Sequence, residues 1–413
     1  MVHEHLTSGR PKILTRSEAT LRRKAHISHL QRFGAALPVI GLILFLIPCS
    51  APGLGIPGPG HANAALNTGT LSDRDGQHDF DFIFGRWKIH TRARAHGSNT
   101  WTDYNGVGTY QKIWDGRAVL NEFETDGQAG HIEGLGVQTY NPKSHQWSLY
   151  WVDSSEGILG VPLIGQFKDG LGAFYSQDTI DGKAMLVSYV WSKMTKSSAH
   201  FEESLSEDGG KTWEAIWISD MARDGDYSGN GPDTAPLPAA AISSSQAADM
   251  ETSGQMDFEP LAGSWNYQMK RRLNPLTGST KWVELSGTGV CYRVWGGRAQ
   301  LDTVELDGAS GHIEGLTLRV FNPQSHEWRL YWANSKDGVL VPPQIGHYKN
   351  GHGEFLAQDL LNGKFILVKY DWTGLKSNSP HFEQSFSDDG GKTWEVNWIT
   401  DQTRRVDAGD KLQ

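Results

Sequence analysis

Residues 130–153 read GHIEGLGVQTYNPKSHQWSLYWVD, and residues 311–334 read GHIEGLTLRVFNPQSHEWRLYWAN. The two stretches lie 181 positions apart (311 − 130 = 181), and the same separation carries DGGKTW at 208–213 to 389–394. Solenoid and propeller repeats recur every 20–50 residues or so, far less than this separation. Each copy is long enough to be a complete domain. The sequence therefore predicts two tandem domains with the same fold.

Tryptophan follows the same duplication. All 16 tryptophans fall into eight matched pairs. Each copy thus repeats the composition as well as the motif. The members are Trp87, Trp101, Trp114, Trp147, Trp151, Trp191, Trp213 and Trp217 in the first copy, and Trp265, Trp282, Trp295, Trp328, Trp332, Trp372, Trp394 and Trp398 in the second.

Within each copy the apolar pattern has a period of two. Short runs of Val, Ile, Tyr, Phe and Trp are closed by turn formers such as Asn141-Pro142, Asp169-Gly170 and Asp181-Gly182. No amphipathic helical stripe longer than two turns interrupts them. The pattern predicts eight to ten antiparallel strands per copy, in a barrel or a sandwich.

The flanking segments suggest an exported protein. Basic residues precede an apolar run at 35–47, and Ala62-Asn63-Ala64 fits a signal-peptidase site. The run is too short to be a stable membrane anchor, which needs about 20 apolar residues. Lipidation at Cys49 and a twin-arginine signal at Arg22-Arg23 are alternative readings. We expect a periplasmic or extracellular protein with these segments: 1–64 signal peptide and leader, 65–77 N-terminal extension, 78–225 first barrel, 226–255 flexible linker, 256–406 second barrel, 407–413 tail.

Composition and motifs exclude several classes of partner. The chain has 38 basic and 47 acidic residues, a net charge of −9, so we expect no nucleic-acid binding. No phosphate-binding glycine motif is present, and the sequence gives no reason to expect a cofactor. We expect no metal, because a strand His-x-Glu supplies only two ligands. Removal of the leader would leave Cys291 as the only cysteine, so no internal disulfide is expected.

Each copy opens with Gly-x-Trp, at Gly85-Arg86-Trp87 and Gly263-Ser264-Trp265, and closes on a strand that ends in arginine, Arg223 or Arg404. An early tryptophan covered by an arginine from the last strand resembles the signature of the calycins. Nearly all of both copies is also similar to an uncharacterised bacterial family of calycin-like (lipocalin-like) β-barrel proteins. The resemblance implies an all-β fold of two tandem antiparallel calycin-like barrels, and it carries no catalytic residue across.

A second motif points to a turn. Residues 206–213 and 387–394 match the Ser-x-Asp-x-Gly-x-Thr-Trp "Asp box" of sialidases. In sialidases that box recurs at propeller-blade spacing, whereas here it recurs after 181 residues. We expect the Asp208 side chain to bond turn amides while the glycines supply positive φ.

Comparison of the copies predicts which strand face is inside, if a charged residue in one copy marks the outside. This predicts an inward set of aromatic and polar side chains that bind the ligand. In the first copy these are Trp147, Trp151, Asp153, Tyr189 and Trp191. In the second they are Trp328, Trp332, Asn334, Tyr370 and Trp372.

The same test places Thr317 and Arg319 outside, and so sends His312, Glu314, Leu316 and Leu318 inward. The equivalent residues of the first copy, His131, Glu133, Leu135 and Val137, are then expected to point inward as well. His131/Glu133 and His312/Glu314 are the best chemical candidates. Three roles are open for them: a structural pair at the barrel end, a contact with a ligand's polar group, or a general acid/base pair.

Three functions follow from these features. The leading hypothesis is that each barrel binds a small, largely apolar or aromatic ligand in a tryptophan-lined lumen. The first alternative is an enzyme, an isomerase, hydratase or hydrolase, that uses the His/Glu pair. The second is a structural or protein-interaction module whose barrels are filled by side chains. The two barrels could also pack against each other within the chain.

Overall fold

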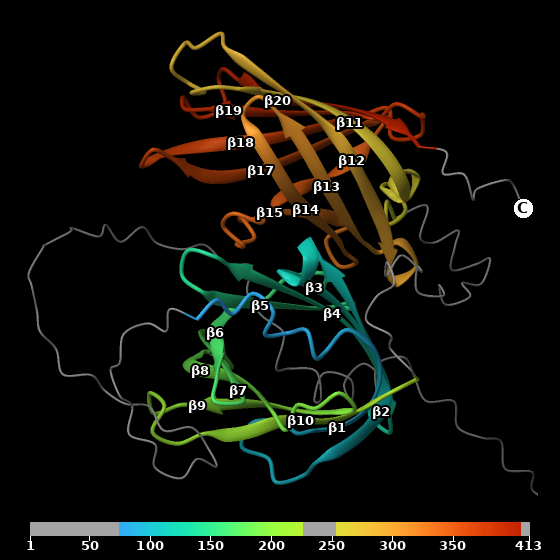
Figure 1. The fold of residues 1–413 in the computed structure, drawn as a ribbon, viewed down its shortest axis with the longest axis vertical. Coiled ribbons are helices and arrows are strands. Elements are labelled where there is room, and N and C mark those ends of the chain that lie inside the picture. Colours follow the sequence, from blue (N-terminus) through green and yellow to red (C-terminus); the bar gives the residue numbers. More distant parts are fainter. Residues whose placement is uncertain (1–73, 226–252, 406–413) are drawn as a thin grey trace, which may run out of the picture.

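The computed structural model describes residues 74–225 and 253–405, which form two closed antiparallel β-barrels (Figure 1). The expected fold class is confirmed, with ten strands in each barrel. The strands occupy 85–223 and 263–404, within the two ranges expected for the barrels. The predicted leader, nearly all of the linker and the tail lie outside the described residues.

Each barrel is an up-and-down meander in which the first strand pairs with the last. The first barrel consists of β1 (Gly85–Ala93), β2 (Thr102–Ile113), β3 (Ala118–Gly127), β4 (Gly130–Asn141), β5 (Gln146–Asp153), β6 (Leu163–Lys168), β7 (Leu171–Ile180), β8 (Lys183–Ser192), β9 (Ser198–Ser206) and β10 (Glu214–Arg223). The second consists of β11 (Gly263–Arg272), β12 (Trp282–Val294), β13 (Ala299–Gly308), β14 (Gly311–Asn322), β15 (Glu327–Asn334), β16 (Gln344–Lys349), β17 (His352–Leu361), β18 (Lys364–Thr373), β19 (His381–Ser387) and β20 (Glu395–Arg404). Three 3₁₀ turns accompany them: η1 (Trp114–Gly116), η2 (Glu259–Leu261) and η3 (Trp295–Gly297).

Local sequence explains the hairpins. The tip between β7 and β8 is Asp181-Gly182, and both residues have positive φ, 51° and 80°. Two successive positive φ values match the twist of a two-residue hairpin, and glycine adopts this conformation without a steric cost. Along β1, buried and exposed residues alternate, so Trp87, Ile89 and Thr91 lie inside. Period two and turn chemistry together produce the meander.

The chain before β1 closes one end of the first barrel. Phe80 packs edge-on against Trp147 and lies near Phe174, and all three are buried. Arg223 at the end of β10 stacks on Trp87 at 4.2 Å and donates to the carbonyl oxygen of Phe84 at 2.5 Å. The calycin-like pairing of an early tryptophan with a terminal arginine is therefore present here.

The second barrel is closed in the same way. Arg404 stacks on Trp265 at 4.1 Å and donates to the carbonyl oxygens of Ala262 and Pro260, at 3.1 and 2.6 Å. Because each arginine joins the last strand to the segment before the first, it ties together the two ends of its meander.

The Asp box is a hairpin turn between β9 and β10, as the sequence predicts. Asp208 Oδ1 accepts hydrogen bonds from the amides of Lys211 and Thr212, both at 2.9 Å, and Oδ2 accepts one from the Thr212 hydroxyl. These hydrogen bonds, those from Thr212 above all, lower the pKa of Asp208 to about 2. The turn lies on the surface, and both oxygens of the Asp208 carboxylate accept hydrogen bonds within it.

The two barrels pack against each other. The outer faces of β2–β5 and β12–β15 meet in an apolar layer, the inter-barrel cluster, and β3–β5 face β13–β15 in Figure 1. Its buried members are Ile113, Trp114, Ala118, Leu120, Leu135, Val137, Tyr150 and Val152 from the first barrel, and Val294, Trp295, Ala299, Leu301, Leu316, Leu318, Val320, Tyr331, Ala333 and Leu340 from the second.

Contacts across this interface come in equivalent pairs. Arg117 donates to both carboxylate oxygens of Glu314 at 2.7 Å, and Arg298 forms the matching ion pair with Glu133. Each contact maps onto the other by the repeat distance of 181. The Tyr150 hydroxyl accepts from the Leu340 amide at 3.1 Å, and Tyr331 does the same for Leu159 at 3.3 Å. The barrels are therefore related like the subunits of a two-fold dimer.

Candidate functional site

A cavity of about 370 Å³ lies inside the first barrel. It opens where β1 ends and β2 begins, at the end away from the Phe80 closure. Its wall is mainly aromatic and aliphatic, as in most small-molecule sites. The phenylalanine, tyrosine and tryptophan residues of the lining are Tyr104, Tyr110, Phe123, Tyr150, Trp151, Tyr189, Trp191, Phe201 and Trp217.

Two buried polar groups of the lining have no hydrogen-bond partner among the described residues. These are Gln138 Oε1 and Trp191 Nε1, on side chains that are 8% and 6% exposed. Buried polar groups are nearly always paired, with protein, water or ligand. Trp372 Nε1, the equivalent of Trp191 Nε1 in the second barrel, is unpaired among the described residues as well, so the unpaired acceptor of Gln138 is the group that belongs to this cavity alone.

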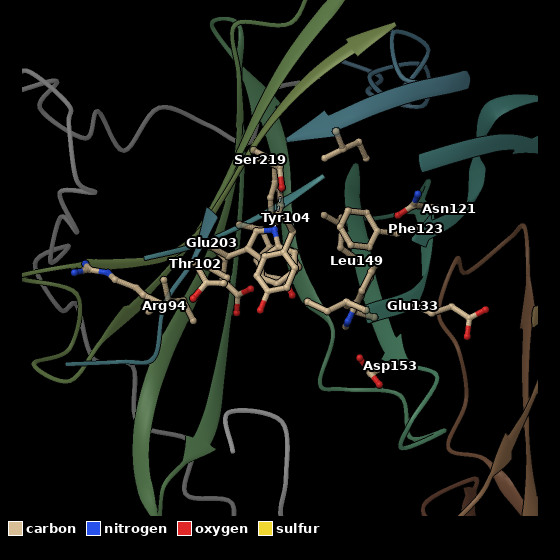
Figure 2. Close-up of a pocket in the computed structure, with 18 of the residues that line it drawn as sticks. Arg94, Thr102, Tyr104, Asn121, Phe123, Glu133, Leu149, Asp153, Glu203 and Ser219 are labelled. Atoms are coloured by element: carbon tan, nitrogen blue, oxygen red, sulfur yellow. Dashed lines mark hydrogen bonds between the residues drawn. The ribbon is translucent and has the colours of Figure 1, made fainter. Parts of the chain in front are cut away.

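Glu203 is the carboxylate on the inner wall. Residues 199, 201, 203 and 205 of β9 share one face, and Phe201 and Leu205 pack in the barrel core. Glu203 lies opposite Tyr189 of β8 and Trp217 of β10, and both of these residues also line the cavity. Burial raises the pKa of Glu203 to about 7. Figure 2 shows its carboxylate among the side chains that line the cavity.

The arginine at the mouth of the cavity is already engaged. Arg94 donates to the carbonyl oxygens of Ala215 at 2.7 Å and Ser98 at 3.0 Å, and it lies 3.5 Å from the carboxylate of Glu214. Its guanidinium also stacks over the Trp101 ring at 4.7 Å. Arg94 therefore builds the rim and does not neutralise Glu203.

Four of the sequence-predicted residues of the first barrel line the cavity: Trp151, Asp153, Tyr189 and Trp191. Asp153 lies at the rim, where its Oδ1 accepts from the Ser155 amide at 2.7 Å. Trp147 instead lies in the closed end, where it is completely buried and its indole N–H donates to the Gly76 carbonyl at 2.9 Å.

The predicted residues of the second barrel contact backbone groups or other aromatic rings of the same barrel. Trp328 repeats the role of Trp147 and donates to the Gly254 carbonyl at 2.9 Å. Asn334 accepts from the Lys336 amide at 3.0 Å in a turn. Trp332 packs on Trp398, and Tyr370 and Trp372 pack on Phe382.

The predicted orientation of β4 and β14 is wrong. Leu135, Val137, Leu316 and Leu318 lie on the outer face, in the inter-barrel cluster. Figure 2 shows Glu133 directed away from Glu203 and Tyr104, toward the second barrel, where its partner is Arg298. Glu314 is bound by Arg117 in the same way. Glu133 contributes atoms only to the rim of the cavity.

The histidines of the two motifs have partners of their own. His131 Nδ1 lies 2.9 Å from the carboxylate of Asp126, and His312 Nδ1 lies 2.9 Å from that of Asp307. Both imidazoles are about half exposed on the side of the strand that carries the glutamates. The structure therefore does not support an acid/base pair within either lumen.

The error has a physical cause. The charge of Arg319 predicts a position on the outer face, but Arg319 is 1% exposed inside the second barrel. Its guanidinium lies 3.0 Å from the Asp302 carboxylate and stacks between Phe258 and Trp372 at 5.2 and 5.3 Å. Charged residues are almost never fully buried unless they are paired, and here the partner is on the neighbouring strand.

A buried polar cluster thus fills this part of the second lumen. The Tyr267 hydroxyl donates to Asp302 at 2.9 Å, and the Cys291 thiol lies beside Gln300 and Arg319. Burial raises the pKa of the Asp302 carboxyl, and Arg319 works against that rise. Burial also opposes the charge on Arg319, but the carboxylate of Asp302 outweighs it and raises the pKa of the guanidinium. The pair is held as an ion pair.

Sequence reasoning missed the residues that distinguish the two lumens. The equivalents of Tyr267, Cys291, Asp302 and Arg319 in the first barrel are Ile89, Tyr110, Asn121 and Gln138, which are uncharged and line the cavity. A signal was present in the sequence. Two positions change together between the copies, from Asn and Gln to Asp and Arg, which is the exchange of a neutral pair for an ion pair.

Within residues 74–225 and 253–405, no three His, Cys, Asp or Glu side chains gather as a metal site. The same residues contain no helix of the length and hydropathy needed to cross a bilayer.

No protein-family model matches this sequence, and no curated protein matches it. Solved structures match in shape. The S-type phycobiliprotein lyase of Guillardia theta is 11% identical, with a TM-score of 0.29, over 38% of this chain and 96% of the lyase. A de novo designed fluorescence-activating β-barrel is 13% identical, with a TM-score of 0.21, over 36% of this chain and 98% of the design. A protein of unknown function from the DUF3598 family of Nostoc punctiforme is 10% identical, with a TM-score of 0.21, over 80% of this chain and 100% of the Nostoc protein.

Proposed function

We propose that the first barrel binds a small, largely apolar or aromatic molecule in its lumen, and that the second barrel supports it through the inter-barrel interface. The observation that carries the proposal is the contrast between two equivalent sets of four residues. In the first barrel these positions line a cavity of about 370 Å³, which suits a small ligand. In the second barrel they form a buried ionic cluster.

The unpaired acceptor of the cavity supports a ligand as its occupant. Gln138 Oε1 is an acceptor set into an aromatic wall. A few fixed polar groups in an apolar pocket orient a ligand, while the aromatic surface supplies most of the buried area.

Transfer of the second barrel's cluster into the first tests this function. The exchange is Ile89→Tyr, Tyr110→Cys, Asn121→Asp and Gln138→Arg. We expect the variant to fold, because the first barrel already has the two rings that the new arginine needs. Phe80 and Trp191 are the equivalents of Phe258 and Trp372, which stack on Arg319 in the second barrel. The exchange leaves the total size of the four side chains nearly unchanged, but it replaces a neutral lining with a buried ion pair and its hydrogen-bonded tyrosine. An apolar ligand loses its apolar surroundings there, so we expect binding to be lost. Native mass spectrometry of protein purified from its own host would show a stoichiometric ligand in the wild type and none in the variant.

The control is Asp103→Asn, an exposed position on β2 whose carboxylate only contacts His90. It should retain the ligand. An equal ligand load in the wild type and in a folded four-residue variant would contradict binding in the lumen. A wild type that carries nothing and binds no naphthalene probe in calorimetry, whether cationic, neutral or anionic, would do so as well.

We also propose that the protein is exported. The support is the basic segment, the apolar run at 35–47 and the Ala62-Asn63-Ala64 site. Fractionation of the native host should recover the protein outside the cytoplasm, and sequencing of its N-terminus should begin near Ala65. A cytoplasmic protein that retains residues 1–64 would overturn this.

A further inference from the structure

Glu203 has no hydrogen-bond donor or cation among the described residues, although it lies on the inner wall of the barrel. Burial is the one cause that shifts its pKa, and no nearby positive charge offsets that burial. In the second barrel the equivalent position is Gln384, whose amide donates to Asn397 Oδ1 at 2.6 Å. One lumen therefore holds a neutral, paired side chain where the other holds an unpaired carboxylate.

The other charged groups of the lining leave this carboxylate uncompensated. Arg94 is bound to carbonyl oxygens and to Glu214, so it is engaged at the rim. Glu133 is paired with Arg298, and His131 with Asp126. Asp153 adds a second acidic group at the rim. The free charge that faces the cavity is therefore negative.

The rings beside Glu203 suit a cation as well. Tyr189 and Trp217 lie directly opposite it on the two neighbouring strands. Burial raises the pKa values of Tyr104, Tyr110 and Tyr189, so these phenols stay neutral. The face of a neutral aromatic ring attracts positive charge, most strongly where water is excluded. A carboxylate between two such rings is a site for an ammonium group.

We propose that the ligand of this cavity is an organic cation, a protonated or quaternary amine on an aromatic or aliphatic body, with its positive group at Glu203 between Tyr189 and Trp217. This inference rests on the proposed function and names its ligand class. The apolar body occupies the space bounded by Phe123, Trp151 and Trp191. An anionic ligand would meet an unscreened like charge in a buried site, which is unfavourable.

Three probes that share one ring system test the charge preference. Naphthylmethylammonium, naphthylmethanol and naphthoate differ in charge and little in size, and calorimetry measures their affinity for the full chain. We expect the ammonium to bind roughly 10- to 100-fold more tightly than the alcohol, as charge-assisted hydrogen bonds do, and naphthoate to bind least. If the alcohol or naphthoate binds as tightly as the ammonium, the inference is overturned and the proposed function stands. If none of the three binds, both fail.

The matched variants are Glu203→Gln and Glu202→Gln. The first repeats what the second barrel has at Gln384, so the fold should tolerate it. We expect Glu203→Gln to abolish the preference for the ammonium and to leave the affinity for naphthylmethanol unchanged. Glu202 lies on the opposite face of the same strand, where Ser204 donates to it at 2.9 Å. Its variant should behave as the wild type. An undiminished preference in Glu203→Gln would overturn the inference.

The pH dependence gives an independent readout. Since the pKa of Glu203 is about 7, its carboxylate is mostly protonated at pH 6 and ionised at pH 8. The ammonium of the probe stays charged over this range, because alkyl ammonium groups titrate near pH 10 or so. Affinity for naphthylmethylammonium should therefore rise as pH rises through about 7 in the wild type, and it should be flat in Glu203→Gln. The same rise in both proteins would count against the site.

Discussion

Asp302→Asn is expected to lower the free energy of unfolding by about 3–5 kcal/mol, since it removes one partner of a buried ion pair. Asparagine keeps an oxygen that accepts from Tyr267, so the hydrogen bond of that hydroxyl survives. Arg319 loses the carboxylate at 3.0 Å and remains charged in a site where it is 1% exposed. Urea unfolding followed by tryptophan fluorescence measures the change.

The double variant Asp302→Asn with Arg319→Gln separates charge from packing. It installs the neutral pair that the first barrel has at Asn121 and Gln138, so no charge is stranded. We expect it to recover most of the stability lost in the single variant. The control Asp220→Asn removes a carboxylate that contacts His200 on the surface, and it should cost less than about 1 kcal/mol. A single variant as stable as this control would show that Arg319 is not held as a buried cation.

Leu318→Asp should separate the two barrels. Leu318 is completely buried in the inter-barrel cluster on the outer face of β14. The change removes a buried leucine and introduces an unpaired charge, so docking should weaken by about 3–5 kcal/mol. Once the barrels part, the aspartate meets water, so each barrel should stay folded. Small-angle X-ray scattering should show a larger radius of gyration with an unchanged far-ultraviolet circular dichroism spectrum.

Leu356→Asp is the matched control, because Leu356 is an exposed leucine on β17 of the same barrel. It should leave the radius of gyration unchanged. Wild-type scattering from Leu318→Asp would mean that the interface does not depend on this apolar layer.

Sequence alone predicted the features that depend on local chemistry and on repetition. Period two and the Asp-Gly turns predicted the strands, and the repeat distance predicted the two barrels. The Trp87–Arg223 and Trp265–Arg404 pairs were expected from position and are present, at 4.2 and 4.1 Å.

Two features could not be obtained in this way, because they depend on long-range pairing. The first is the face of β4 and β14. A charged residue marks the outside only when water solvates it, and Arg319 is solvated by Asp302 instead. The second is the difference between the lumens. The lumens differ because the four equivalent positions are neutral in the first barrel and include an ion pair in the second. This ion pair is recognised only once the structure brings Asp302, Tyr267 and Arg319 into contact.

The reciprocal interface has a consequence for synthesis of the chain. The N-terminal barrel carries both halves of each contact, since Arg117 and Glu133 lie on it together, as do the Tyr150 hydroxyl and the Leu159 amide. Until the second copy has been made and folded, a folded first barrel displays a self-complementary apolar face. The first barrels of two chains therefore carry complementary contacts and can pair with each other. The tandem arrangement favours the pairing within one chain, because the effective concentration of a partner on the same polypeptide does not depend on the expression level.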